Sequence, residues 1–313
     1  MSEKKRKGTP LWQISKKFNF AAEKIIPDSF VFCVVLTLVV AVLSLTVCHI
    51  GPVELLTSWW DGLSSQFTLA FQMGLMVVVC ATCARSPQVS KLLDGLSGLV
   101  HTRVAALILL MAFGYVSSML NWAFCTIVTP ILAMQLAKRV KGLHFPMMVA
   151  GGYCCMILGQ CLGPSATLYS NLATEGSNYA EIVGKTMTVA ETCYNPVNVV
   201  LWVILAVCFI VLVLFTQPGD DELVELRSIA TQADVAPKDY QSREKATTPA
   251  EKMNTCKPIM WVVGAAIFIY IIYSIATKGF FATLNMNMVI FMFVGINCFL
   301  FPQPHSWMEA HTD

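Results

Sequence analysis

The stretch SSMLNWAFCT, from Ser117 to Thr126, places hydroxyl and amide side chains inside an apolar segment that runs from Val104 to Ala137. A helix that crosses a lipid bilayer normally carries leucine or valine at such positions, because hydrogen bonds left unmade in hydrocarbon cost free energy. The interruption therefore predicts a point where the chain departs from a regular membrane helix.

The composition around this stretch is that of a membrane protein. Hydrophobic residues make up 56% of the 313 residues and charged residues 13%, and the mean hydropathy is +0.64. Soluble domains carry about a quarter charged residues, so an all-α integral membrane fold is expected. The basic, amphipathic N-terminus lacks the apolar region and cleavage site of a signal peptide. Most of the twelve cysteines lie in apolar runs, which argues against a disulfide scaffold.

Apolar segments of spanning length alternate with polar ones along the chain. The predicted segments are a basic N-terminal segment at 1–28, spans at about 29–48 and 67–83, a hairpin at 104–137, a broken helix at 145–171, a span at 197–215, a charged loop at 216–257, two spans within 258–301 and a tail at 302–313.

The distribution of Lys and Arg predicts the orientation of these segments. If the N-terminus is cytoplasmic and the spans alternate, nineteen of the 21 basic residues lie on the cytoplasmic side, and Lys185 and Lys278 lie outside. The ends of the 104–137 segment must then both be cytoplasmic. Two full crossings need about 20 residues each, so we expect a re-entrant hairpin that turns near Leu120–Asn121, within the polar stretch.

A second polar interruption follows in the next apolar segment, from Gly159 to Asn171. Its glycines and Pro164 break a helix, and broken helices that meet inside a membrane indicate a transporter binding site. The candidate substrate- or ion-binding residues of the two interruptions are Ser117, Ser118, Asn121, Thr126, Gly159, Gln160, Gly163, Ser165, Thr167, Ser170 and Asn171. The simpler interpretation stays open, because membrane hydroxyls often bond their own helix and Asn121 can simply cap the turn.

The predicted spans contain no Asp, Glu, Lys, Arg or His, and the five histidines fall at span edges or near the C-terminus. A proton relay or a membrane-embedded acyl-group enzyme would need such groups, so neither is expected. The pair Cys80 and Cys83 has CxxC spacing without a second pair, so we predict no metal site. Neutral oxygens and helix ends can still hold a small anion and a sodium ion.

NWAF, within SSMLNWAFCTIVTPILAMQLAKRV, resembles the short-chain fatty acid transporter family, which includes acetoacetate and butyrate carriers and belongs to the wider ion-transporter group of carboxylate carriers. The similarity extends over about residues 20–300. It includes the stretches PDSFVFCVVLTLVV, SWWDGLSSQFTLAFQMGLMVVV and MVAGGYCCMILGQCLGPSATL.

The resemblance implies an inverted-repeat transporter, in which each repeat holds a re-entrant hairpin and a broken helix, working by alternating access. Residues 29–215 would form the first repeat and 258–301 the start of a second. Because family members are longer, the second repeat is expected to be truncated. The implied activity is secondary-active uptake of short-chain monocarboxylates. A dicarboxylate or amino-acid carrier of the same group, and a non-transporting fragment, are the alternatives.

The expected surroundings follow from this resemblance and from the charge distribution. We expect a multi-pass protein of the inner membrane with a cytoplasmic N-terminus. The expected partners are membrane lipid and a small carboxylate, without nucleic acid, and a homo-oligomer is left open. No cofactor is expected other than sodium as a coupling ion.

Overall fold

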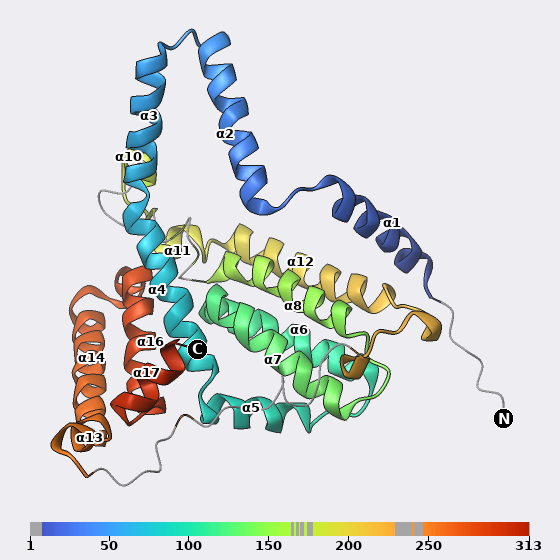
Figure 1. Cartoon of the computed structure of the whole chain (residues 1–313), viewed down its shortest axis with the longest axis vertical. Coiled ribbons are helices and arrows are strands. Elements are labelled where there is room, and N and C mark those ends of the chain that lie inside the picture. Colours follow the sequence, from blue (N-terminus) through green and yellow to red (C-terminus); the bar gives the residue numbers. More distant parts are fainter. Residues whose placement is uncertain are drawn as a thin grey trace.

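The computed structural model describes residues 8–163, 166, 169, 172–173, 178–228, 240 and 247–312. All regular secondary structure within these residues is helical (Figure 1). Six helical segments there are long and apolar enough to cross a membrane, namely Ser29–Thr46, Pro52–Ala84, Arg103–Leu120, Phe145–Leu162, Pro196–Phe215 and Pro249–Lys278. The prediction of an all-α integral membrane protein is confirmed.

Proline in the first turn begins many of the helices, because the first helical N–H needs no partner within the helix. The helices are α1 Pro10–Ile25, α2 Ser29–Thr46, α3 Pro52–Ser65, α4 Phe67–Ala84, α5 Pro87–Ser97, α6 Arg103–Leu120, α7 Trp122–Arg139, α8 Phe145–Gly159, the short η1 Gln160–Leu162, α10 Asn178–Val183, α11 Val189–Thr192, α12 Pro196–Phe215, η2 Asp220–Glu222, η3 Leu226–Ser228, α13 Pro249–Asn254, α14 Lys257–Lys278, α15 Phe280–Thr283, α16 Met286–Leu300 and α17 Pro304–Thr312.

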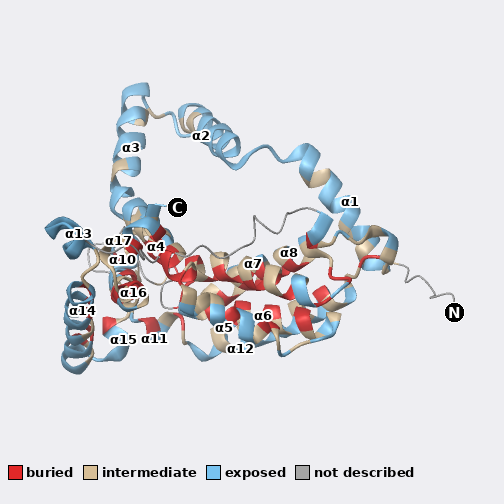
Figure 2. Ribbon diagram, turned by 60° about the horizontal axis from the view of Figure 1, so that its bottom comes forward, coloured by how far each residue is buried: buried red, intermediate tan, exposed pale blue. Residues whose placement is uncertain are grey.

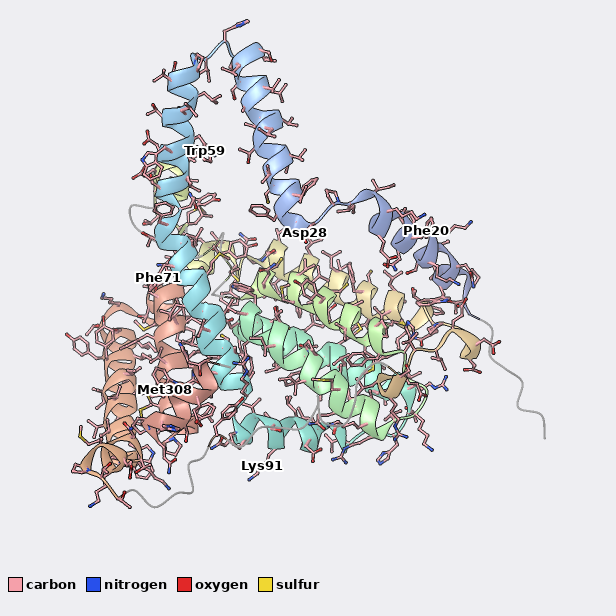
Figure 3. The ribbon with its side chains drawn as sticks, in the orientation of Figure 1. Phe20, Asp28, Trp59, Phe71, Lys91 and Met308 are labelled. Atoms are coloured by element: carbon pink, nitrogen blue, oxygen red, sulfur yellow. The ribbon has the colours of Figure 1, made fainter. Side chains whose placement is uncertain are left out.

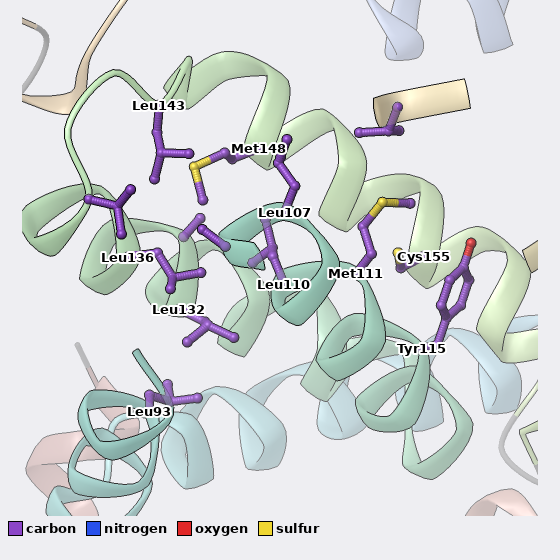
Figure 4. Packing of buried hydrophobic residues seen from close by; sticks show 14 of the residues in the cluster. Leu93, Leu107, Leu110, Met111, Tyr115, Leu132, Leu136, Leu143, Met148 and Cys155 are labelled. Carbon is purple, nitrogen blue, oxygen red and sulfur yellow. The ribbon is translucent and has the colours of Figure 1, made fainter. Parts of the chain in front are cut away.

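The helices α6, α7 and α8 pack side by side and share the largest buried cluster, to which α12 contributes from the other side of α8 (Figures 1 and 4). Small residues allow the close approach of these helices, as is usual in membranes. A Cβ built on Gly152 would lie 2.5 Å from the methyl carbon of Thr129, and one on Gly114 would lie 2.9 Å from the Cβ of Cys155.

A second buried cluster joins α4 to α7 and α16. Met76 and Cys80 of α4 pack there with Ala123 of α7 and with Val289 and Phe293 of α16. The helix α14 lies on the far side of α16 (Figure 1). The last helices therefore pack on the middle of the chain through α4.

The helices α2 and α3 extend away from the rest of the chain and are exposed along their lengths (Figure 2). No residue of α2 is buried, although its sequence is almost entirely apolar. In a membrane protein such side chains face lipid. The long rod formed by α3 and α4, 33 residues in all, runs from this exposed end to the buried cluster around α4.

The amphipathic α1 lies beside the ends of α8 and α12. Trp12 of α1 donates its indole N–H to Glu222, and Lys16 pairs with the same carboxylate at 2.5 Å. The ring of Trp12 also meets His144 edge-on, with 5.1 Å between ring centroids. Figure 3 shows the side chains of this region around the labelled Phe20.

The segment 104–137 forms two helices, α6 and α7, that are separated only by Asn121. Each arm contains 18 residues, which at 1.5 Å per residue is about 27 Å, close to the thickness of the hydrocarbon core. Each arm is thus longer than a helix that reaches only the middle of the bilayer, as the arms of a re-entrant hairpin do. In the charged segment 216–257, the described residues also include a helix, α13, which begins with a capping box at Thr248 and Glu251.

Candidate functional site

The turn between α6 and α7 consists of one extended residue, Asn121, with φ −163° and ψ 131°. Its backbone N–H closes α6 by donating to the carbonyl of Ser117 at 2.9 Å. Its side-chain oxygen opens α7 by accepting from the N–H groups of Ala123 at 2.8 Å and Phe124 at 3.1 Å. Asparagine is among the best residues for this position because its short amide reaches back to the first turn. The polar stretch of the sequence is therefore a helix cap.

Asn121 also faces α4, where it meets two sulfur atoms. Its side-chain nitrogen donates to the sulfur of Met76 at 3.0 Å, and the thiol of Cys80 lies 3.4 Å from its side-chain oxygen. These residues lie near the middle of α4, and Asn121 itself is fully buried. The side chain of Asn121 is consequently enclosed by protein, whereas its neighbour Leu120 is exposed.

The second interruption lies against the same tip. The hydroxyl of Ser118 in α6 donates to the carbonyl of Met156 in α8 at 2.9 Å. Beyond the end of α8, a Cβ built on Gly163 would lie 3.1 Å from the carbonyl oxygen of Ser118 and 3.2 Å from that of Met119. The backbone at the break therefore touches the last carbonyls of α6. The two interruptions, predicted separately, meet at one junction.

Helix ends of opposite polarity converge at this junction. The C-terminus of α6 presents carbonyl oxygens, and the N-terminus of α7, one residue away, presents N–H groups. The carbonyl end suits a cation and the N–H end suits an anion. Ser118, Asn121, Gly159 and Gly163 are all buried, so these four residues of the junction are shielded from bulk solvent.

Of the other predicted residues, two bond within their own helix, one follows the end of α8, and four lie outside the described residues. The hydroxyl of Ser117 donates to Gly114 at 3.1 Å, and that of Thr126 donates to Trp122 at 2.9 Å, as the simpler interpretation anticipated. Gln160 follows α8 and is partly buried. The remaining four predicted residues, together with Pro164, lie outside the described residues: Ser165, Thr167, Ser170 and Asn171.

Sequence reasoning missed a second buried amide near the α4 side of the junction. Asn297 of α16 is fully buried and donates to the carbonyl of Val79 at 2.8 Å, while its side-chain oxygen has no partner within the described part of the chain. The indole N–H of Trp122, the first residue of α7, is also buried without a partner there. The sequence signal for Asn297 was an amide side chain within the apolar run of α16, the same signal that Asn121 gives within the segment 104–137.

No group of three His, Cys, Asp or Glu side chains capable of holding a metal ion occurs among the residues that the structure describes. Cys80 and Cys83 are both buried and carry free thiols. The site thus consists of helix ends, hydroxyls and amides.

The profile of a protein family described as short chain fatty acid transporter matches residues 11–313. The chain belongs to the short-chain fatty acid transporter family. The prediction of this family from NWAF and its neighbouring stretches is confirmed, and the six apolar helices agree with a multi-pass membrane protein.

Two bacterial relatives carry the same name, "Putative short-chain fatty acid transporter". The protein of Escherichia coli strain K12 is 26% identical over 300 residues, which cover 95% of this chain and 66% of the relative. The protein of Haemophilus influenzae is 25% identical over 307 residues, which cover 95% of this chain and 67% of the relative. The chain therefore spans about two thirds of the length of these relatives. No solved structure matches it.

Proposed function

We propose that this chain acts in the inner membrane, with its N-terminus in the cytoplasm, in secondary-active transport of short-chain monocarboxylates. Transport would proceed by alternating access, with the junction of α6, α7 and α8 as the binding site. The family and the names of the two relatives support this substrate class. A carrier rather than an enzyme also agrees with a junction that offers only neutral polar groups.

One observation carries the proposal: the helix break after α8 packs on the tip of the hairpin, with Gly163 against the carbonyls of Ser118 and Met119. Irregular backbone at membrane depth is tolerated where protein or a water-filled cavity covers it. In transporters, interrupted helices of this kind surround the substrate. A closed, buried junction is what an occluded state requires, and a ligand would enter when α8 and the hairpin separate.

The polarity of the helix ends suggests where the substrate carboxylate and the sodium ion would bind. A substrate carboxylate would replace the side-chain oxygen of Asn121 as the acceptor of the N–H groups at the start of α7. It would also replace the carbonyl of Met156 as the acceptor of the Ser118 hydroxyl. A sodium ion would bind carbonyl oxygens at the end of α6, since hard cations prefer oxygen ligands. Asn121 lies between the two ends and would order both. With no Asp, Glu, Lys, Arg or His in the predicted spans, we propose sodium rather than proton coupling.

The transport test is uptake of radiolabelled butyrate by the purified chain in liposomes. We expect uptake that requires an inward sodium gradient and stops when choline replaces sodium. Uptake driven by a proton gradient in choline would overturn sodium coupling. Preference for succinate or alanine would favour the dicarboxylate or amino-acid alternative. Chemical conversion of butyrate would favour an enzyme, and the absence of both binding and uptake would favour a non-transporting fragment.

The site is tested by separating the capping role of Asn121 from a ligand role. Asn121→Ser keeps a side-chain oxygen that can cap α7, but it removes the amide nitrogen and shortens the side chain. If the junction binds substrate or sodium, equilibrium binding of butyrate or sodium should weaken about tenfold in Asn121→Ser, the loss of one or two net hydrogen bonds. Unchanged affinity for both in a folded Asn121→Ser protein would show that Asn121 is only a cap.

A further inference from the structure

A cavity of about 370 Å³ lies at the turn between α14 and α16, away from the junction described above. Its wall is polar for a surface between membrane helices. Six of the residues that line it carry hydrogen-bonding or charged side chains: Tyr270, Ser274, Lys278, Thr283, Asn285 and Asn287. Among the residues that the structure describes, no Asp or Glu lines it. A cavity with a cation, several neutral polar groups and no carboxylate favours an anion.

The donors of this cavity are available. Lys278 forms no ion pair with any residue that the structure describes. The side-chain oxygen of Asn285 caps α16 by accepting from the N–H of Met288 at 3.0 Å, and that of Asn287 accepts from Gln72 at 2.7 Å. Because the oxygen of each amide is engaged, the two side-chain nitrogens remain as donors.

The turn that holds these donors is well braced. Gly279 has φ +87°, a conformation that side chains rarely adopt, and it lets the chain reverse directly after Lys278. The buried hydroxyl of Thr283 lies 2.8 Å from the carbonyl of Gly279 and 3.1 Å from that of Ser274. These contacts fix α15 on the end of α14, so the cavity is preformed.

The cavity also leads toward the hairpin tip. A neighbouring cavity of about 450 Å³ shares Asn287 and Phe291 with it and reaches α4 at Thr68 and Gln72. Gln72 precedes Met76, the partner of Asn121, by four residues on the same helix face, which is about 6 Å along the axis. Polar side chains thus extend from Lys278 to Gln72, one helical turn from Met76.

The position of Lys278 sets the side from which this route opens. Lys257 begins α14 and Lys278 ends it, and the 22 residues of this helix give a length of about 33 Å, which matches a bilayer. Lys278 therefore lies at the opposite membrane face from the charged segment before α14. If that segment is cytoplasmic, the cavity opens to the outside.

We propose that the cavity at Lys278 is an entry site that captures small carboxylates before they reach the junction at Asn121. The inference rests on the proposed function and deepens it by adding a binding site on the approach route. Lys278 supplies the charge, while Asn285 and Asn287 add hydrogen bonds. The site takes a compact monocarboxylate, because the cavity offers one cation and a wall that is apolar around Phe291.

Site-specific protection tests this proposal on the full chain. Ala282, an exposed residue of the cavity wall, is replaced by cysteine, and its labelling by N-ethylmaleimide is quantified by mass spectrometry with and without butyrate. We expect butyrate to slow labelling at residue 282 several-fold, and the uncharged butyramide to leave the rate unchanged. Equal protection by butyramide would overturn the role of charge.

Variants of the lysine make the test specific. Lys278→Gln should weaken protection by butyrate about 3- to 10-fold, as expected for a charge-assisted hydrogen bond at a partly exposed site, whereas Lys278→Arg should retain it. Lys185→Gln is the matched control, since it removes the other basic residue predicted on the same side but does not line the cavity. Unchanged protection in Lys278→Gln, or an equal loss in Lys185→Gln, would overturn the proposal.

Equilibrium binding of radiolabelled butyrate, measured on the same preparations, distinguishes failure of the entry site from failure of the proposed transport function. Binding without any protection at residue 282 would overturn the entry site and leave the proposed function standing. The absence of binding and protection together would overturn both.

Discussion

Gly159 lies directly against Ser118, and the contact leaves no room for a side chain on the glycine. A Cβ built on Gly159 would come within 2.6 Å of the Cβ of Ser118 and 3.2 Å of the carbonyl oxygen of Tyr115. At this point α8 and the hairpin arm α6 are as close as their backbones allow. The Ser118 hydroxyl uses this proximity to reach the carbonyl of Met156.

Replacing Gly159 by alanine should therefore separate α8 from α6 and destabilise the fold by about 1–3 kcal/mol, as overpacking does. The matched control is Gly151→Ala in the same helix, where the nearest atom to a new Cβ, on Val213, would be 3.8 Å away in ordinary contact. Thermal melting in detergent should show a clear decrease for Gly159→Ala and little change for Gly151→Ala. Equal melting temperatures for the two variants would contradict a close contact between Gly159 and Ser118.

The cap at Asn121 predicts a graded loss of stability. Asn121→Ala removes the acceptor for two N–H groups of α7 in a buried place and should cost about 1–2 kcal/mol. Asn121→Ser should recover part of this loss. Melting temperatures should follow the order asparagine, serine, alanine. An alanine variant as stable as the wild type would show that the first turn of α7 needs no side-chain cap.

The distribution of basic residues predicts the topology. Single cysteines at Lys91 and Lys252, in a background without other reactive thiols, should react with a membrane-impermeant maleimide only from the cytoplasmic side. Cysteines at Lys185 and Lys278 should react only from the outside. Labelling is compared between intact cells and inside-out vesicles. A cysteine at Lys252 that reacts in intact cells would refute the topology, because the charged loop would then lie outside.

The docking of α1 should depend on pH through Glu222. Hydrogen bonds from Lys16 and Trp12 lower the pKa of the Glu222 carboxyl below its ordinary value. A lowered pKa means that the carboxylate stabilises docking above the ordinary glutamate pKa, about 4.3, and that this stabilisation is lost as the pH falls below that value. Burial also lowers the pKa of His144. The stability that neutral His144 contributes therefore begins to fall at a higher pH, as the pH drops below the ordinary histidine pKa of about 6.5.

Hydrogen exchange of residues 10–25 measures this dependence, with Glu222→Gln as the reference at each pH. The wild type should be several-fold better protected than Glu222→Gln at pH 6–7. The difference should decrease as the pH falls below about 4.3 and vanish below the lowered pKa of Glu222. A difference that stays unchanged from pH 6 to pH 3 would show that Glu222 acts through its shape rather than its charge.

The sequence predicted most of the helices because apolar length is a local property. Spans expected at 29–48, 67–83 and 197–215 correspond to α2, α4 and α12. The turn of the hairpin was expected near Leu120–Asn121 and lies at Asn121. The short helices α10, α11 and α13 were not anticipated, because polar segments of four to six residues carry little periodic signal.

The roles of individual polar residues were less predictable. Ser117, Ser118 and Thr126 look alike in sequence, yet Ser117 and Thr126 bond within their own helix and Ser118 bonds across to α8. The choice depends on which helix face meets a neighbour. The role of Asn297 depends on the packing of α16 on α4, which brings its side-chain amide to the carbonyl of Val79.

The sequence alone determined the membrane class, the family and the two points at which apolar helices are interrupted, since these follow from composition and from residue order over short distances. Only the tertiary structure decided that the two interruptions meet, with Gly163 against the end of α6 and Asn121 between two sulfur atoms of α4. The reason is physical: a helix break is encoded by its own residues, whereas its partner is chosen by packing between segments distant in the chain, where small residues such as Gly159 allow backbones to touch.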